Sequence, residues 1–241
     1  MFTVAERDAI RDRVLALAAD DPRVVAAAVV GSLALGPGDE WSDLDLTFAV
    51  ANGEPVADVI EDWTGRVAKL GGVVLFDLPA GSTIYRVFLL PGCLQVDLSF
   101  TPEAEFAPGS PNWRLLFGSA GEPAHPLPPP ANQVVGHGAL FAVHARASIA
   151  RGRPWQAEHW ITRVRDEALA LASRRHGLRG ADYRGVDELP PNLLEHAAAT
   201  RVGALETAEL RRALRAAVEL LLAEAGEEAA HVEARLRELV A

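Results

Sequence analysis

The sequence predicts an α+β protein, in which a small mixed β-sheet flanked by helices is followed by an all-α helical bundle. Two observations support this prediction. Short apolar or alternating segments, which are typical of strands, occur only before about residue 122, and the remainder has helical spacing of apolar residues. Between the two parts, GEPAHPLPPPAN (121–132) contains three consecutive prolines, which favour a stiff, extended connector.

The expected domain limits follow from this change in composition. We expect one domain over 1–122, a proline-rich linker over 123–131 and a helical domain over 132–241. In the first domain, Thr3 and Glu6 form a capping-box pattern that predicts the start of a helix. The predicted elements are a helix over 4–19, strands over 23–30 and 43–50, a helix over 55–70, and strands over 73–78, 83–90 and 93–100. The last two strands are expected to form a hairpin.

The helical domain is divided by glycine and proline residues. Gly152, Gly177 and Gly226 stand where helices end, and Pro154 stands where a first-turn proline belongs. The spacing of apolar residues predicts helices over 133–151, 154–176, 189–200, 207–225 and 227–240.

Charge and cysteine content narrow the classes of function. The chain has 241 residues and a formal net charge of -10, which disfavours binding to extended nucleic acid. One cysteine, Cys93, excludes an internal disulfide and a cysteine zinc site. The charged N-terminus is unlike a signal peptide, and no apolar run is long enough to span a bilayer. We therefore expect a cytoplasmic protein without a membrane partner.

Three carboxylates stand out on the predicted strands. Asp43 and Asp45 alternate with apolar residues, so they share one strand face, about 6–7 Å apart. Asp97 has the same position on a later strand, a few strands further along the chain. Mg²⁺ prefers oxygen ligands, and three converging carboxylates could hold two such ions about 3.5–4 Å apart for displacement at phosphorus. The pattern thus indicates a two-metal site.

A second motif precedes these acids. Gly31 and Ser32 follow the apolar strand over 23–30 and open the segment that leads to Asp43. A strand that ends in glycine and continues into a helical turn presents backbone N–H groups to an anion, because no Cβ obstructs the approach. The Ser32 hydroxyl could bind the same anion. The pair is a candidate phosphate-binding turn.

Together these motifs carry a family resemblance. GSLALG…SDLDL, with ten residues between Ser32 and Asp43, followed by QVDLSF, resembles the DNA polymerase β-like nucleotidyltransferase superfamily. The match covers residues 24–100, approximately. A minimal catalytic domain with an appended helical bundle is similar to the layout of the aminoglycoside and lincosamide nucleotidyltransferases.

The resemblance implies an activity and residue roles. It implies transfer of a nucleoside monophosphate from an NTP, with ATP as the expected donor, to a hydroxyl of a small molecule, with two Mg²⁺ ions. Gly31 and Ser32 would bind the triphosphate, Asp43 and Asp45 would be metal ligands, and Asp97 would be the third ligand and activate the acceptor hydroxyl. An acidic cleft would attract a polycation, which makes an aminoglycoside antibiotic, and hence antibiotic resistance, an expected possibility.

One departure from the family pattern bears on the triphosphate. Many relatives carry a basic residue where this chain has Leu35, so the charge must come from elsewhere, and Arg165 of the helical domain is our candidate. Asp166 beside it could contact the acceptor. The simpler interpretation of this helix is packing of Trp155 and Trp160 together with ion pairs between neighbouring turns.

Other polar and aromatic residues have two interpretations each. His137 and His144 lie seven apart on one helix face, where packing is more frequent than metal binding; His125 in the linker is expected to be exposed. Arg86 either pairs with a site carboxylate or caps the sheet face. Trp41 either stacks on a nucleobase or anchors its turn.

Several alternatives to small-molecule modification remain. The same core adenylylates proteins in antitoxin-type nucleotidyltransferases, which usually lack so large a bundle. Template-independent RNA polymerases share it, but the net charge disfavours a long RNA track. A non-catalytic nucleotide-binding module and a structural domain with solvated acids also fit. A monomer and a homodimer are both compatible with the sequence.

Overall fold

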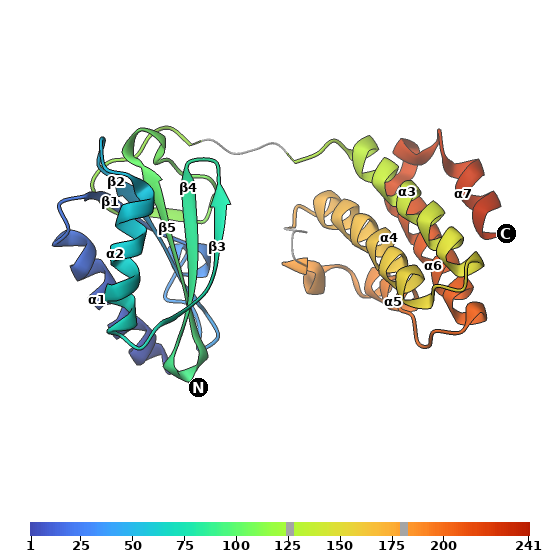
Figure 1. Cartoon of the computed structure of the whole chain (residues 1–241). Coiled ribbons are helices and arrows are strands. Elements are labelled where there is room, and N and C mark those ends of the chain that lie inside the picture. The colour runs from blue at the N-terminus through green and yellow to red at the C-terminus, as the bar shows by residue number, and fades with distance from the viewer. Residues whose placement is uncertain (124–127, 179–182) are drawn as a thin grey trace. The chain divides into compact units, whose positions relative to one another are not determined.

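The computed structural model describes residues 1–123, 128–178 and 183–241 (Figure 1). The chain divides into two compact units, Met1–Leu127 and Pro128–Ala241. The first contains a mixed six-stranded sheet with two α-helices, and the second is helical, so the predicted α+β class is confirmed. The division falls within the stretch expected to be a linker; His125 lies outside the described residues.

The first unit follows the predicted order of elements with one addition. Its helices and strands are α1 (Val4–Ala19), β1 (Val24–Val30), β2 (Leu44–Val50), α2 (Val56–Ala68), β3 (Val73–Ala80), β4 (Thr83–Leu90), β5 (Leu94–Pro102) and β6 (Trp113–Phe117). The predicted capping box is present, since Glu6 N–H donates to Thr3 Oγ1 and Thr3 N–H donates to Glu6. The sequence did not indicate β6, because WRLLF is short and shows no alternation of polar and apolar residues.

The strand order β3-β4-β5-β2-β1-β6 brings the two acidic strands together. β5 pairs directly with β2, in parallel, whereas the other neighbouring strands are antiparallel. Asp97 therefore lies on the strand next to that of Asp45. The helix α2 and the hairpin of β3 and β4 supply the long crossover that a parallel pair requires.

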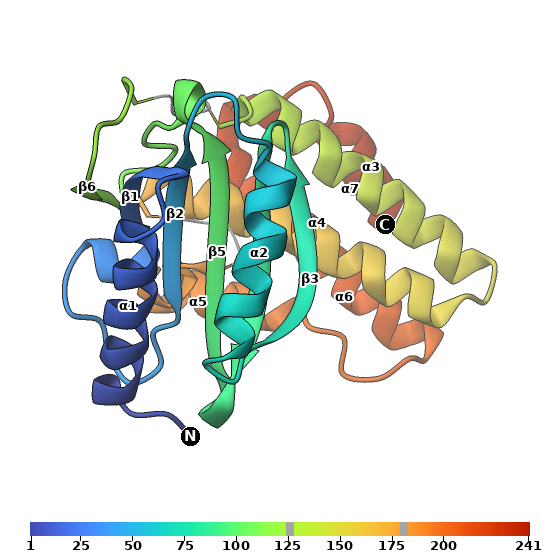
Figure 2. The ribbon, with the colours of Figure 1, turned by 60° about the vertical axis from the view of Figure 1, so that its left-hand side comes forward.

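One face of the sheet is apolar and covered by helices. Figure 2 shows α1 and α2 lying on the same side of the strands. Phe48, Trp63 and Phe100 are fully buried there, with ring centroids 5.1 to 5.3 Å apart. Because strand residues alternate between faces, this packing turns Asp45 and Asp97 to the opposite face.

The opposite face has its own small cluster. Ala26, Ala28 and Ala49 are buried against Phe106, and Trp113 packs beside them. Small side chains on β1 and β2 leave space for the segment that follows β5 to lie over the sheet. The remainder of this face carries polar side chains on β5 together with apolar ones such as Val87 of β4.

A buried acid joins the end of α1 to α2. Asp21 is 2% exposed and accepts hydrogen bonds from Arg23 and from Trp63 Nε1, and it forms an ion pair with Arg66 at 2.9 Å. Burial alone raises the pKa of Asp21, but the hydrogen bonds from Arg23 and Trp63 and the charge of Arg66 outweigh it and lower this pKa to about 2. Ionised Asp21 therefore stabilises the fold.

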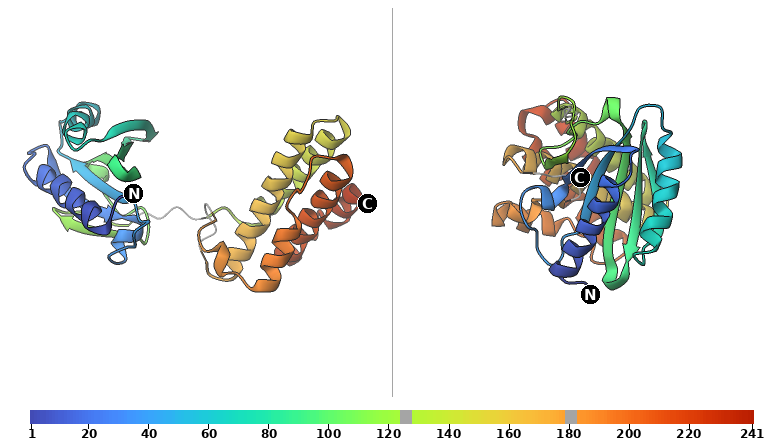
Figure 3. Two further views of the ribbon diagram at one scale, coloured as in Figure 1. Left: turned by 90° about the horizontal axis from the view of Figure 1, so that it is seen from below. Right: turned by 90° about the vertical axis from the view of Figure 1, so that its left-hand side faces the viewer.

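The second unit is built around three long helices. Its α-helices are α3 (Ala131–Ala150), α4 (Pro154–Arg175), α5 (Pro191–Ala199), α6 (Thr207–Ala225) and α7 (Glu233–Val240). α3, α4 and α6 pack against one another (Figure 3). A Cβ at Gly138 would lie 2.6 Å from Leu221 Cδ2, so glycine permits the close approach of α3 to α6. The single helix predicted over 227–240 is wrong: a 3₁₀ turn, Gly226–Ala229, precedes the shorter α7. Of the helices in the described ranges, none combines the length and the apolar character needed to cross a bilayer.

The Asp21 network makes acid sensitivity a test of this packing. Its folded-state pKa of about 2 is below the usual 3.8, so its stabilisation is present above pH 4 and is lost as the pH falls toward 2. We expect Asp21→Asn to lower the free energy of unfolding at pH 6 by ~2 kcal/mol and to flatten its decrease between pH 4 and pH 2. Urea denaturation at pH 6, pH 4 and pH 2 measures the free energy of unfolding. Asp20→Asn, at an exposed neighbouring position, is the control. An unchanged acid-induced loss in Asp21→Asn would contradict the assignment.

Candidate active site

The parallel pairing of β2 with β5 places two of the predicted acids side by side. Asp45 is the direct register partner of Asp97, and Asp43 precedes β2 by one residue. Register partners point to the same face, and so do residues two apart along a strand. All three side chains are half-buried. The backbone thus presents Asp45 and Asp97 on the face of the sheet that α1 and α2 leave open, and Asp43 stands directly before the strand.

Asp97 is the acid with the most distinctive electrostatics. Burial raises the pKa of Asp97, and the negative charge of Asp43 raises it further. Gln95 opposes this effect, because its side-chain amide lies 3.1 Å from each oxygen of Asp97 and donates to the carboxylate. Asp97 therefore holds protons more strongly than an exposed aspartate, as a group that accepts a proton during a reaction requires.

Gly31 lies in contact with this acidic row. It opens a 3₁₀ turn, Gly31–Ala34, directly after β1, as predicted, and its φ of +69° is in the left-handed region. A Cβ at this position would stand 2.2 Å from Asp45 Oδ2. Glycine is therefore required by the backbone conformation and by the approach of the carboxylate.

The predicted anion-binding turn differs in detail from the expectation. The N–H of Gly31 donates to the carbonyl of Asn112 at 3.2 Å, so it is engaged rather than open to a phosphate. Ser32 is exposed beside it. Arg114 of β6 donates to the Leu33 carbonyl at 3.4 Å; its register partner is Val29, so the residue lies on the helix-covered face and its guanidinium reaches the end of the turn. No sequence motif marked Arg114, because β6 itself was not predicted.

A buried arginine shapes the loop that joins the turn to Asp43. Arg7 of α1 is completely buried, and its guanidinium donates to the carbonyls of Asp39 (2.6 Å) and Pro37 (2.7 Å). Ser42 Oγ donates to Asp39 Oδ1 at 2.9 Å and closes the end of the loop. These bonds hold the loop from inside the fold, so the entry of the chain into β2 is defined. Sequence analysis did not single out Arg7, which reads there as an ordinary helical arginine.

Two other predicted residues are placed away from this row. Arg86 extends toward α2, where it pairs with Asp77 (2.6 Å) and Glu61 (3.2 Å), so it does not pair with a site carboxylate. Trp41 is 67% exposed, which excludes the interpretation that it anchors its turn by packing. Its indole is accessible beside the loop.

Arg165 belongs to α4 in the second unit. It donates to Thr162 Oγ1 and to the Tyr183 hydroxyl, both at 3.2 Å, and the Tyr183 hydroxyl donates to Asp166. This surface cluster is local to the bundle, and a role for Arg165 in binding a nucleotide stays a prediction.

The histidines of the bundle pack against aromatic rings. His144 lies 4.9 Å from Trp160, and His137 lies 6.2 Å from Phe141, measured between ring centroids. These contacts favour packing over metal binding. Trp155 is 75% exposed, so the expected packing of both tryptophans holds for Trp160 alone.

The three aspartates have the oxygen ligands that a hard divalent cation such as Mg²⁺ prefers, but their side chains are not arranged around a common point. Among the described residues, no group of three or more His, Cys, Asp or Glu side chains is arranged to hold a metal ion. Asp43, Asp45 and Asp97 nevertheless supply only carboxylate oxygens, which are ligands that Mg²⁺ prefers, and two of them, Asp45 and Asp97, are register partners on one face. Mutual repulsion between acids is expected to keep such side chains apart when no cation lies between them.

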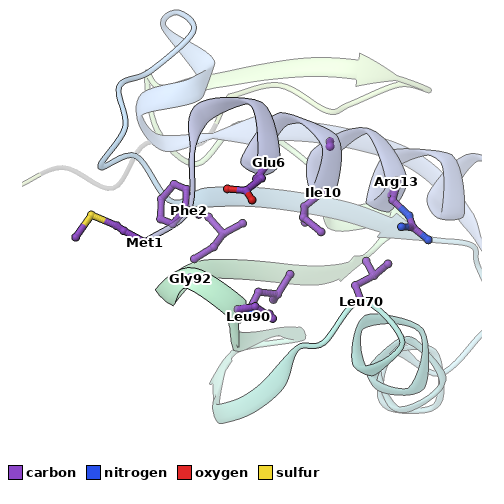
Figure 4. A pocket seen from close by; sticks show the side chains of 11 residues that line it. Met1, Phe2, Glu6, Ile10, Arg13, Leu70, Leu90 and Gly92 are labelled. Carbon is purple, nitrogen blue, oxygen red and sulfur yellow. The ribbon is translucent and has the colours of Figure 1, made fainter.

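A separate hollow of about 330 Å³ lies between the start of α1 and the turn joining β4 to β5 (Figure 4). Its walls are mainly apolar, with Ile10, Leu70 and Leu90 among them, and Glu6 and Arg13 at its edge. Glu6 is engaged in the cap of α1. This hollow contains none of the three aspartates.

Comparison with solved structures finds several distant likenesses, of which two follow. One is an aminoglycoside 6-adenyltransferase from Bacillus subtilis, with 10% identity, a TM-score of 0.37 and 99% of both chains covered. The other is in the structure of the GLD-2/RNP-8 complex, with 13% identity, a TM-score of 0.28, and 90% of this chain and 76% of that chain covered. No family model and no curated protein matches the chain. At such low identities and TM-scores, neither likeness carries an argument about activity.

The geometry at Gly31 makes a direct prediction. We expect Gly31→Ala to destabilise the first unit by about 1–3 kcal/mol, because the new Cβ meets both the left-handed φ and the Asp45 carboxylate. Gly81→Ala is the matched control, since Gly81 also has a positive φ (+63°) but faces open space. Chemical denaturation of both variants measures the difference. Equal destabilisation would contradict the contact between Gly31 and Asp45.

Proposed function

We propose that this chain is a nucleotidyltransferase of the DNA polymerase β-like superfamily. It transfers a nucleoside monophosphate, with ATP as the expected donor, to a hydroxyl of a small molecule and releases pyrophosphate. The observation that carries the proposal is the register pairing of Asp45 with Asp97 beside the Gly31 turn. Two acids from separate strands and a glycine turn from a third then meet at one place, as the sequence motif predicts.

The reaction assigns a task to each group. The acceptor oxygen forms a bond with the α-phosphorus, and the bond from that phosphorus to the oxygen bridging to the β-phosphate breaks. The acceptor proton passes to Asp97, which stands beside Asp45 on the same face of the sheet. Pyrophosphate leaves toward the 3₁₀ turn, where Ser32 and Arg114 stand.

Asp43, Asp45 and Asp97 would hold the divalent cations, with Mg²⁺ expected. When bound, such ions polarise the phosphate oxygens and lower the pKa of the acceptor hydroxyl. The chain itself supplies the placement of the three acids, the contact of Asp45 with Gly31 and the hydrogen bond from Gln95 to Asp97. The role of Arg114 replaces, within the same unit, the basic residue that relatives carry at the position of Leu35.

Removal of the Asp97 charge tests the reaction. We expect Asp97→Asn to abolish turnover while nucleotide binding changes little, because the turn and the β2 acids remain. The measurement is pyrophosphate release with Mg²⁺, four NTPs and a panel of hydroxylated small molecules, alongside nucleotide binding by calorimetry. Asp77→Asn is the control, since Asp77 is an acid of the same sheet that pairs with Arg86 near α2.

The results of that screen distinguish the proposed reaction from its alternatives. Release at the wild-type rate from Asp97→Asn would remove Asp97 from the mechanism. Labelling of a co-expressed protein in place of a small molecule would favour the antitoxin-like alternative. Nucleotide binding by the wild-type chain without release under any condition would favour a non-catalytic module.

Arg114 is tested by its effect on the donor. We expect Arg114→Ala to raise the KM for ATP about tenfold and to change kcat less, because a charge-assisted contact with the triphosphate is lost. Arg11→Ala is the matched control, since Arg11 lies on α1 in ion pairs with Asp8 and Asp12. An unchanged KM in Arg114→Ala would show that the triphosphate charge is supplied elsewhere.

A further inference from the structure

A second hollow, of about 310 Å³, lies on the carboxylate face of the sheet. Its floor continues the strands past the acids: Thr47, Ser99 and Tyr85 form the next row across β2, β5 and β4, about 6–7 Å from the row of Asp45 and Asp97. Thr83 and Thr101 form the row after that, with their hydroxyls 2.9 Å apart. The hollow thus begins where the candidate active site ends.

The walls of this hollow have a consistent chemistry. Its floor presents hydroxyl groups, each of which both donates and accepts hydrogen bonds. Its side wall is aromatic, since Phe106 and Trp113 lie 5.6 Å apart between ring centroids. Glu105 is the carboxylate among the lining residues, and it already accepts a hydrogen bond from Ser82 at 2.6 Å. These walls suit a ring with hydroxyl substituents and an apolar face.

The position of the hollow relative to the turn has a mechanistic consequence. β1 is antiparallel to β2, and Val29 pairs with Leu46, so the chain enters the Gly31 turn beside the start of β2. The hydroxyl rows begin at Thr47, farther along β2. The acids therefore lie beside both the turn and the hollow, whose lining also includes Val30, the residue directly before Gly31. In an in-line displacement, the attacking and leaving oxygens stand on opposite sides of the phosphorus.

We propose that this hollow is the acceptor subsite and that it takes a neutral, hydroxyl-bearing ring such as a sugar or a cyclitol. The inference rests on the proposed function: if pyrophosphate leaves toward the turn, the acceptor hydroxyl approaches from the hollow. Its oxygen bonds to the α-phosphorus as its proton passes to Asp97. The acidic face alone would suggest a polycationic acceptor. The hollow is lined mainly by hydroxyl groups and aromatic rings, and its carboxylate, Glu105, already accepts a hydrogen bond, so the lining favours a neutral ring.

Pairs of ligands that have similar rings but differ in charge show whether the hollow prefers a neutral ring. Ligand-observed NMR with the full chain would compare glucose with glucosamine, and myo-inositol with 2-deoxystreptamine. We expect binding of at least one neutral member and weaker binding of its amino counterpart. Thr47→Val and Thr101→Val remove a hydroxyl with little change in shape, and each is expected to weaken this binding about fivefold or more.

Thr64→Val is the control variant, because the Thr64 hydroxyl donates to the Ile60 carbonyl on α2, outside the hollow. It should bind the neutral ring as the wild type does. Thermal melting of all three variants checks that they fold. Preference for the amino counterparts, absence of binding by both neutral rings, or equal binding by Thr47→Val and Thr64→Val would overturn the proposal.

Measurement of pyrophosphate release tests the acceptor subsite and the nucleotidyl-transfer reaction separately. We expect the bound neutral ring to support ATP-dependent release, with kcat/KM for the ring lowered in Thr47→Val and KM for ATP unchanged. Transfer that proceeds equally in Thr47→Val and Thr101→Val would overturn the hollow as acceptor subsite and leave the reaction in place. Binding in the hollow without release from any of four NTPs would overturn the reaction, and with it the acceptor role.

Discussion

The parallel pairing of β2 with β5 is the constraint on which the candidate site depends. It sets Asp45 opposite Asp97 and Thr47 opposite Ser99, so the acids and the first hydroxyl row share one face. A shift of one residue in this register would turn one strand's polar residues into the apolar core. The aromatic packing of Phe48, Trp63 and Phe100 opposes such a shift, because these rings fill the helix-covered face. The core and the site are thus determined by the same pairing.

The two faces of the sheet have different tasks. The face under α1 and α2 provides the apolar burial that stabilises the unit, whereas the other keeps small residues on β1 and polar residues on β2 and β5. Alanines at positions 26, 28 and 49 allow the Phe106 segment to cover part of this face. That partial cover forms a wall for the hollow beside the acids and leaves the row of Asp45 and Asp97 half-exposed.

Local backbone geometry at the turn is supported from within the core. Gly31 adopts a positive φ against Asp45, and the loop that follows is held by the buried guanidinium of Arg7. A buried arginine is costly unless its donors are satisfied, and two carbonyls and Asp8 satisfy them here. The entry into β2, and with it the position of Asp43, is thereby held by α1. Positioning of the site therefore involves a helix on the far face of the sheet.

Period-two alternation and helical spacing were sufficient to determine the α+β class, the bounds of α1 and β4, and those of β1, β2 and β5 to within two residues, because these properties are local. Only tertiary structure decided which strands are neighbours: β5 lies beside β2, and β6 forms an edge. It also decided the carbonyl partner of Gly31 and the hydrogen bonds of Arg7 and Arg114. Each joins residues distant in the chain, and no local pattern encodes which strand becomes a neighbour. The same holds for the hydroxyl-lined hollow, whose floor and aromatic wall come from strands and a loop that only the folded sheet brings together.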